Sequence, residues 1–285
     1  MMGSNKRSGG DLTRRVLTRL LSRPLMRGKL DTAYRLAVGK SHLPPWHLRY
    51  YVGPPADFEA IGVEFMAYMK ALFHLKPEDR VIDIGCGSGM IAMQLADYLI
   101  TPGQYTGMDI SGEAIAWCQK NISPEQARFQ CIHSDVRNTH YNPTGRIEVD
   151  QYSFPLPTSS ADFVLLKSVF THMLPGGLEH YLDEIHRLMA DEGRALLTFF
   201  LIPGTAEERA HLMRKPAYDF RFGNDEVRFV KEDDPEYVTA YSEAYVRALL
   251  AQHDLTVRKP IHYGTWSGRR GGLQFQDLVL VTKTQ

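Results

Sequence analysis

Glycines at positions 85, 87 and 89 give the strongest chemical signal in this 285-residue sequence, which there reads Val81-Ile82-Asp83-Ile84-Gly85-Cys86-Gly87-Ser88-Gly89. Because glycine has no Cβ, backbone N–H groups of such a turn and the N-terminus of a following helix can approach an anionic or polar ligand closely. Residues 80–84 form a short β-branched run, and a helix-like run follows Gly89. The pattern predicts a strand, a ligand-binding glycine loop and a helix.

The spacing of the glycines excludes two phosphate-binding loops. A dinucleotide fingerprint needs its third glycine at position 90, where this chain has Met90. A P-loop needs Gly-Lys-Ser/Thr after the turn, which is absent from this position. The glycines therefore belong to a third type of loop.

Acidic and polar residues follow the next two predicted strands. Asp109 closes the strand Tyr105–Ile110, and Ser111 is a plausible N-cap for a helix through Asn121. An acid about twenty residues beyond the glycines is where ribose recognition needs one, although Asp109 could simply terminate a strand. Ser134-Asp135-Val136 follow the third strand, 128–133.

The glycine run closely resembles the first motif of class I S-adenosylmethionine-dependent methyltransferases, and the landmarks over residues 58–200 and 240–283 follow in the same order. The resemblance implies that Gly85 and Gly87 admit the methionine portion, while Asp83 holds its ammonium directly or through water. It also implies that Asp109 accepts from the ribose hydroxyls and Asp135 from the adenine amino group. The implied cofactor is S-adenosylmethionine, with S-adenosylhomocysteine as product, and the implied cofactor-binding residues are Asp83, Gly85, Cys86, Gly87, Gly89, Asp109, Ile110, Ser134, Asp135, Val136, Lys167 and Ser168.

Besides Asp109, other residues in this set also have a structural alternative. Asp83 could cap the loop, Asp135 could be an ordinary acid at a strand end, and Cys86 fits a small filler better than a nucleophile.

His172 is the predicted general base. It lies in the segment 167–174, which resembles the family's segment after strand four that closes over the cofactor. If the nucleophile is a hydroxyl, a base assists methyl transfer, and imidazole has an unperturbed pKa near cellular pH. The alternative is a packed or cofactor-side histidine without a role in proton transfer.

The sequence favours a metal-independent O-methyltransferase for a small-molecule, sugar or natural-product acceptor. The strand-four segment has no Asn/Asp-Pro-Pro-aromatic tetrapeptide, typical of many enzymes that methylate nucleobase or amide nitrogen, and no carboxylate for a divalent metal. Nucleic acid is not expected as a partner, because a duplex usually demands a broad basic face. N- or C-methylation and a noncatalytic S-adenosylmethionine-binding module remain alternatives.

Strands alternating with helices predict a Rossmann-like α/β fold: a mainly parallel seven-stranded sheet, helices on both faces and an antiparallel last strand. Ligands of such sheets lie at the carboxyl ends of the strands. Besides the strands named above, the expected strands are 163–166, 195–202, 255–262 and 275–282, and the expected helices are 57–75, a run from the glycine loop through 99, 175–189 and 242–253.

The chain is expected to comprise a basic N-terminal helical extension, 1–57, and a methyltransferase domain, 58–285, with a cap or substrate insertion at 203–241. Residues 1–50 carry eleven Lys and Arg against two Asp, although the net charge of the whole chain is zero. Apolar residues from Leu12 to Leu21 alternate with arginines near helical spacing, so this arm could contact anionic lipid, dock on the acidic remainder or be partly disordered.

Cellular location is predicted from what the sequence lacks. No stretch of about eighteen apolar residues and no secretory signal is present, so a cytoplasmic enzyme is expected, with peripheral membrane contact as an alternative. Three widely spaced cysteines indicate neither a disulfide framework nor a CxxC metal site. The oligomeric state is not predicted.

Overall fold

The computed structural model describes residues 24–50, 57–122, 128–204 and 216–285. The chain divides into two compact units, one up to Ala60 and one from Ile61 to Gln285. The predicted basic helix around Leu12–Leu21 lies outside the described residues. None of the described helices has the length and apolar character that crossing a membrane requires.

The first unit contains α2 (Pro24–Ala37), α3 (Trp46–Arg49) and the start of α4 (Phe58–Ala71). A partly buried carboxylate, that of Asp31, joins α2 to α3. It accepts hydrogen bonds from Arg35 Nε on the same helix (2.8 Å), from the Arg49 guanidinium and from the backbone N–H of Trp46 (3.2 Å). Ionic contacts therefore lie inside this small unit.

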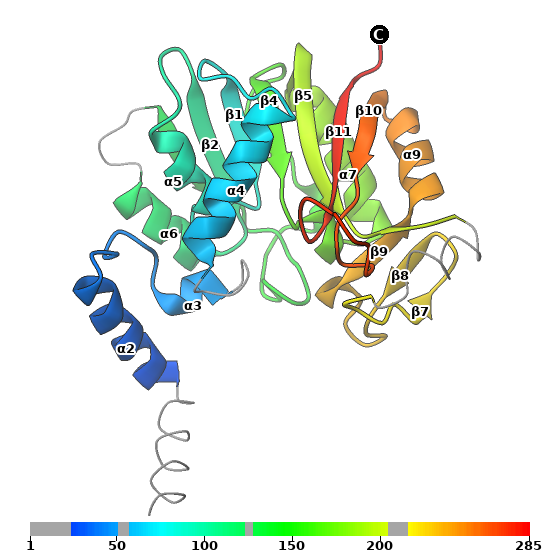
Figure 1. Cartoon of the computed structure of the whole chain (residues 1–285). Helices are drawn as coiled ribbons and strands as arrows, with labels where there is room; N and C mark the ends of the chain where they lie inside the picture. The colour runs from blue at the N-terminus through cyan, green and yellow to red at the C-terminus, as the bar shows by residue number, and fades with distance from the viewer. Residues whose placement is uncertain (1–23, 51–56, 123–127, 205–215) are drawn as a thin grey trace, which may run out of the picture. The chain divides into compact units, whose positions relative to one another are not determined.

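The second unit is built on the predicted seven-stranded sheet, in the order β10-β11-β5-β4-β1-β2-β3 (Figure 1). The five strands from β5 to β3 run parallel, whereas β11 is antiparallel to both its neighbours. This confirms the predicted α/β class and the antiparallel last strand. The strands are β1 (Arg80–Ile84), β2 (Gln104–Asp109), β3 (Phe129–His133), β4 (Ala161–Leu166), β5 (Met189–Phe199), β10 (Leu255–His262) and β11 (Asp277–Lys283).

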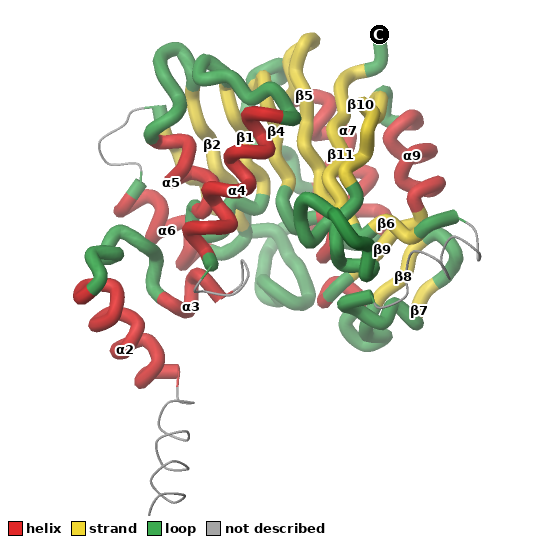
Figure 2. Tube along the Cα trace, viewed as in Figure 1, coloured by secondary structure: helices red, strands yellow, loops and turns green. Residues whose placement is uncertain are grey.

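Helices cover both faces of this sheet, with α4 in front and α7 behind in the view of Figure 2. The central strand β4 is therefore buried almost throughout, as expected for a parallel strand covered on both faces. Ser111 caps its helix as predicted, because its Oγ accepts from Ala114 N at 3.3 Å. The remaining helices are α5 (Met90–Ala96), α6 (Gly112–Asn121), α7 (Pro175–Leu188) and α9 (Glu243–Gln252).

Several predicted boundaries are wrong. The fifth strand begins at Met189 rather than Ala195, because Met189 pairs with Ala161 of β4 even though exposed Asp191 and Glu192 interrupt the apolar pattern. The helix after the glycine loop ends at Ala96 instead of Leu99, and α4 ends at Ala71 instead of Leu75. Tertiary strand pairing thus outweighs local polarity at the start of β5.

A second, four-stranded sheet follows β5, and it contains the short strands predicted around residues 223–225. Leu201–Ile202, expected to continue the fifth strand, forms β6 of this sheet instead. The other strands are β7 (Phe222–Gly223), β8 (Val227–Phe229) and β9 (Thr239–Ser242), in the order β6-β9-β8-β7. Because β6 comes directly after β5, this sheet starts at the carboxyl edge of the main sheet.

The carboxylate of Asp277, at the start of β11, ties the two sheets together. It accepts from the backbone N–H groups of Leu201 (2.7 Å) and Gly264 (2.6 Å) and from Trp266 Nε1 (2.8 Å). Burial raises its pKa to about 6, against the opposing effect of these hydrogen bonds.

We expect Asp277→Asn to lower the free energy of unfolding by about 1–3 kcal/mol, because one amide oxygen cannot serve three converging donors. The folded-state pKa lies above that of an unfolded Asp, so the contribution of Asp277 to stability is largest at low pH and declines as pH rises toward 6. The loss should therefore be larger at pH 5 than at pH 8 in urea unfolding. Asp225→Asn, at a fully exposed carboxylate, is the control. An equal loss at both pH values would contradict the assignment.

Candidate functional site

The glycine loop between β1 and α5 adopts a left-handed backbone at Gly85, Gly87 and Gly89, with φ of 80°, 54° and 81°. A Cβ at Gly85 would lie 2.4 Å from Cγ2 of Val169, in the segment that follows β4. Glycine is therefore required by the backbone conformation at all three positions, and at position 85 also by the close approach of Val169.

The backbone N–H groups of this loop are largely engaged inside the protein. Those of Gly85 and Cys86 donate to the carbonyl of Met108 (2.7 and 3.0 Å), and that of Gly89 donates to the carbonyl of Cys86 (3.0 Å). The expectation that these amides face a ligand is thus wrong for the three residues. Instead, the loop is anchored on β2, and only its glycines present no side chain to a ligand.

Asp109 holds the loop from the end of β2. Its Oδ2 accepts from Gly87 N at 2.7 Å and its Oδ1 from Ser111 N at 2.8 Å. Burial raises the pKa of Asp109, while hydrogen bonds from Ser111 and Gly87 oppose the rise. Each carboxylate oxygen can accept more than one hydrogen bond, so Asp109 can bind a hydroxyl as well as position the loop.

Asp83 is buried near the end of β1, where its Oδ2 accepts from the Tyr105 hydroxyl at 2.9 Å. Burial raises its pKa to about 7, and the negative charge of Asp109 adds to the effect. The half-buried Lys167, whose own pKa is lowered by burial, acts in the opposite direction on Asp83. A carboxylate in this state favours the approach of a cation, which would offset the cost of burying its charge.

The predicted adenine-side residues lie after β3, and polar partners already engage two of them. The buried Ser134 Oγ accepts from the Tyr152 hydroxyl at 2.8 Å. Asp135 forms an ion pair with the exposed Arg146, which lowers the pKa of Asp135. Val136 is buried, and the half-buried Ile110 offers its carbonyl to His133 Nε2 at 3.2 Å.

Ser168, directly after Lys167, is a non-glycine residue in the left-handed region, with φ of 62°. Its backbone N–H donates to Thr198 Oγ1 (2.7 Å) and its hydroxyl to Gln276 Oε1 (3.0 Å). Gln276 in turn donates to Thr171 Oγ1 at 3.3 Å. Gln276 is not among the predicted site residues. No local sequence signal connects it to Ser168, about a hundred positions earlier.

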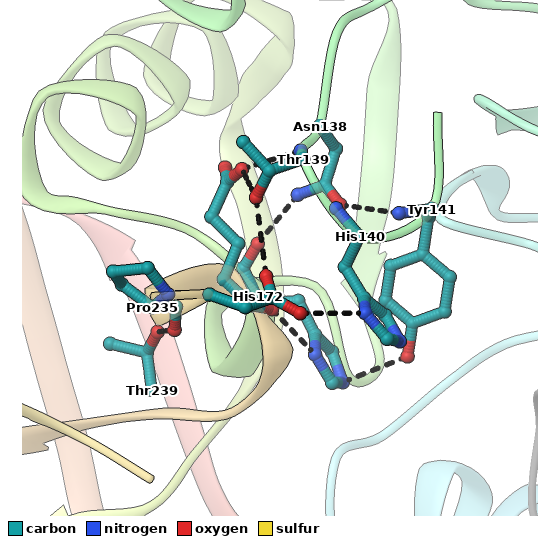
Figure 3. A network of polar contacts seen from close by, with 9 residues as sticks. Asn138, Thr139, His140, Tyr141, His172, Pro235 and Thr239 are labelled. Atoms are coloured by element: carbon teal, nitrogen blue, oxygen red, sulfur yellow. Dashed lines mark hydrogen bonds and ion pairs between the residues drawn. The ribbon is translucent and has the colours of Figure 1, made fainter. Parts of the chain in front are cut away.

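His172 lies in the short 3-10 turn Phe170–His172 that follows β4. Its Nδ1 is 3.1 Å from the carbonyl oxygen of Glu236, and its Nε2 is 3.4 Å from the hydroxyl of Tyr141 (Figure 3). A carbonyl can only accept, so Nδ1 carries the proton in the neutral ring and Nε2 holds the lone pair. Burial lowers the pKa of His172, which keeps the ring neutral at pH 7.

Two segments meet around this histidine, residues 138–141 and residues 234–236 (Figure 3). Thr139 donates to the Glu236 carboxylate through its backbone N–H (2.7 Å) and its hydroxyl (2.6 Å). His140 Nδ1 lies 3.0 Å from Asp234 Oδ2, and Asn138 Nδ2 donates to the His172 carbonyl at 2.9 Å. The sequence analysis named His172 alone and missed these partners.

A known protein family matches the part of the chain that carries most of these residues. Residues 82–197 match the family described as Methyltransferase domain. The tRNA N(3)-cytidine methyltransferase of Gallus gallus is 27% identical over 119 residues, which are 41% of this chain and 29% of that protein. A probable cobalt-precorrin-6B C(15)-methyltransferase (decarboxylating) of Thermoplasma acidophilum is 40% identical over 64 residues, 22% of this chain and 32% of that one. The chain thus spans about a third or less of these curated relatives.

Solved structures share the fold over most of the chain. A SAM-dependent methyltransferase from Aquifex aeolicus aligns with a TM-score of 0.52 and 15% identity over 82% of this chain and 96% of that one. The 1,6-didemethyltoxoflavin-N1-methyltransferase of Burkholderia thailandensis was solved with bound 1,6-didemethyltoxoflavin and S-adenosylhomocysteine. It aligns with a TM-score of 0.50 and 13% identity over 99% of this chain and 94% of that one. The family match across the glycine loop shows that residues 82–197 carry a methyltransferase domain, and the fold around it is the one found in solved S-adenosylmethionine-dependent methyltransferases.

Proposed function

We propose that this protein transfers a methyl group from S-adenosylmethionine to a hydroxyl oxygen of a small-molecule, sugar or natural-product acceptor, with His172 as general base. The observation that carries the proposal is the polarity of the His172 ring. Its Nδ1 faces the carbonyl of Glu236, so its basic Nε2 points to the Tyr141 hydroxyl, at the carboxyl edge of the sheet where ligands of this architecture bind.

The donor set near the glycine loop fits the cofactor. The buried Asp83 carboxylate, with its raised pKa, suits an ammonium group, and Asp109 has acceptor capacity left for a vicinal diol. Gly85 and Gly87 keep side chains away from the space above the loop. Asp135 is already ion-paired with Arg146. To accept a hydrogen bond from the adenine amino group, its carboxylate would have to leave Arg146 or bind both groups.

Catalysis would rest on positioning and on removal of one proton. When bound, S-adenosylmethionine supplies an electrophilic methyl group on its sulfonium. The acceptor hydroxyl would replace the Tyr141 hydroxyl at His172 Nε2. This nitrogen would take the hydroxyl proton as the C–O bond to the methyl group forms and the methyl–sulfur bond breaks, with S-adenosylhomocysteine as the leaving group. The Glu236 carbonyl, hydrogen bonded to Nδ1–H, would stabilise the imidazolium that results. Within this proposal, the described part of the predicted insertion, residues 216–241, forms a cap that helps to hold the acceptor.

The relatives leave other acceptors open. Their names refer to nitrogen of a tRNA cytidine, carbon of a cobalt-precorrin and nitrogen of a toxoflavin precursor. N- or C-methylation is therefore the principal alternative for this chain. The protonation state and orientation of His172 favour a hydroxyl acceptor, since a hydroxyl needs a base more than a neutral amine does.

We expect Asp109→Asn to weaken binding of S-adenosylhomocysteine by roughly 10- to 100-fold, because charge-assisted hydrogen bonds to the ribose are lost. Isothermal titration calorimetry measures the change, and circular dichroism verifies the fold. The control is Asp97→Asn, at an exposed carboxylate just after α5. Unchanged affinity in a folded Asp109→Asn variant would remove Asp109 from the binding site.

Binding of S-adenosylhomocysteine should depend on pH through Asp83. Its pKa of about 7 in the free protein means that below pH 7 the carboxyl group must release a proton before it pairs with the ligand ammonium. The dissociation constant should rise by up to about tenfold for each pH unit below 7. The Asp83→Asn variant should bind S-adenosylhomocysteine more weakly than the wild type. Its affinity, measured by calorimetry, should not change between pH 5.5 and 8. A wild-type affinity that is constant over this range would refute the role.

His172→Gln should reduce methyl transfer by about 100- to 10,000-fold and leave affinity for S-adenosylhomocysteine unchanged, because only proton removal is lost. At saturating S-adenosylmethionine, where the weaker binding predicted from Asp83 does not limit the rate, wild-type rates should be constant from pH 8 to 6.5. They should fall in more acidic solution, since burial lowers the pKa of His172 and keeps the imidazole neutral until then. The assay follows tritium from methyl-labelled S-adenosylmethionine into low-molecular-mass extracts, with His186→Gln as control. Full activity of His172→Gln would exclude the base, and the absence of labelled product would favour a noncatalytic module.

A further inference from the structure

The loop between β10 and β11, residues 263–276, lies at the carboxyl edge of the main sheet (Figure 1). This follows from strand pairing, because Asp277, which starts β11, pairs with Phe199, which ends β5. The middle of the loop, residues 267–272, has the sequence Ser-Gly-Arg-Arg-Gly-Gly, and we call it the arginine tip. The arginine tip therefore belongs to the edge where ligands of this architecture bind.

Arg269, in the arginine tip, is held in place without use of its hydrogen-bond donors. Its guanidinium carbon lies 3.9 Å from the centre of the Tyr263 ring, and a guanidinium stacked in this way keeps the N–H groups at its rim free. Tyr263 is itself fixed, because its hydroxyl donates to Glu243 Oε2 (2.8 Å) while Arg247 Nε donates to Oε1 of the same carboxylate (2.9 Å). Among the described residues, no group accepts a hydrogen bond from Arg269.

Ser267, also in the arginine tip, adds a second unused donor. The residue is 3% exposed, and within the described ranges its Oγ has no hydrogen-bond partner. Buried hydroxyl groups in proteins are nearly always hydrogen bonded, so an unpartnered one two positions before Arg269 is an independent sign that this tip is built to bind an acceptor group.

The charge at the arginine tip indicates the kind of ligand. Exposed Arg270 and half-buried Arg269 have no carboxylate partner in the part of the chain that the structure describes. The acids that interact with their surroundings are Glu243, which is paired with Arg247, and Asp277, which already accepts three hydrogen bonds. Many other arginines of the second unit do contact carboxylates: Arg80, Arg137, Arg146, Arg187, Arg194, Arg221 and Arg228. The tip thus has positive charge that the protein itself leaves unpaired.

We propose that the arginine tip binds an anionic group of the methyl acceptor, a carboxylate or a phosphate. The planar fork of a guanidinium matches the oxygen atoms of either group and can bind them bidentately. The loop also touches the proposed reaction site, because Gln276, near its end, donates to Thr171 Oγ1 (3.3 Å), beside His172. This inference rests on the proposed function and narrows it: the acceptor carries an acidic group in addition to the hydroxyl that is methylated.

A polynucleotide offers the same phosphate chemistry but explains fewer of the observations. Binding of a nucleic acid normally uses many phosphate contacts from a broad basic surface. The arginine tip provides two guanidinium groups, Arg269 and Arg270, and many other described arginines of this unit are already paired with carboxylates. A single acidic group on a small acceptor needs no more than the tip supplies.

Titration of the full chain, saturated with S-adenosylhomocysteine, tests the anion site directly. Inorganic phosphate and, separately, benzoate are the probes, and the arginine side-chain Nε–H resonances in NMR spectra report binding. At least one probe should shift these resonances to saturation, and the probe that does so identifies a phosphate or a carboxylate site. Arg269→Gln/Arg270→Gln should weaken binding about tenfold or more, because charge-assisted hydrogen bonds are lost. Arg269→Lys should also bind more weakly than the wild type, since an ammonium group cannot form the bidentate pair.

A matched control removes the same charge from the adjacent strand. Arg258→Gln/Lys259→Gln alters two exposed side chains of β10 and should bind the probes like the wild type. All variants should retain the wild-type heat of S-adenosylhomocysteine binding, which verifies their folding. The proposal is overturned if neither probe saturates, if the Arg269/Arg270 variant binds like the wild type, if the control loses affinity equally, or if tRNA binds at these arginines and displaces the probe.

The tritium assay then separates this inference from the proposed function. Methylation of a hydroxyl leaves the acidic group intact, so the labelled product should be retained on an anion-exchange resin and released by salt. Arg269→Gln/Arg270→Gln should lower its formation about tenfold or more when the extract is limiting. Labelled product that is not retained would overturn the acidic acceptor, whereas anion binding without any labelled product would contradict the proposed methyl transfer and leave the anion site supported.

Discussion

The carboxylate of Asp109 is the contact on which the arrangement of the binding loop depends. It stands at the carboxyl end of β2 and accepts the backbone N–H of Gly87, which brings a loop that starts on β1 onto the neighbouring strand. Without a side chain at Gly85 or Gly87, nothing on these two residues blocks the space above the loop. Burial raises the pKa of Asp109 and, separately, that of Asp83, to which the negative charge of Asp109 adds; a bound cation can offset this cost.

A second organising feature lies across the carboxyl edge from the glycine loop, after β4. The turn that holds His172 is contacted by residues 138–141, from the irregular segment before β4, and by residues 234–236, from the segment before β9. Direct contacts between Thr139 and Glu236 and between His140 and Asp234 join these two segments to each other. Three separate parts of the chain thus set the orientation of one imidazole ring, which restrains it more than a single loop could.

Asp277 connects this edge to the framework of the sheet. Its carboxylate binds the start of β6 and the loop that contains Gly264 and Trp266, while the adjacent Gln276 contacts Ser168 and Thr171. Residues at and just before the start of the antiparallel last strand therefore support the segment after β4. The unusual backbone at Ser168, with φ of 62°, persists because hydrogen bonds to its N–H and hydroxyl over-determine it.

The sequence by itself determined the succession of the main-sheet strands and of the helices along the chain, the position of the glycine loop and the residue at the end of β2. These features depend on local periodicity, on glycine at φ above zero and on the family motif, all of which are carried by neighbouring residues. Only the tertiary structure decided that β5 starts at Met189, that Leu201–Ile202 joins another sheet, and that the loop amides of Gly85 and Cys86 bond to Met108. It also decided that Tyr141, Glu236 and Gln276 contact the segment after β4. The physical reason is that these contacts join residues about twenty to more than a hundred positions apart. At such separations packing and hydrogen-bond satisfaction, rather than local pattern, select the partner.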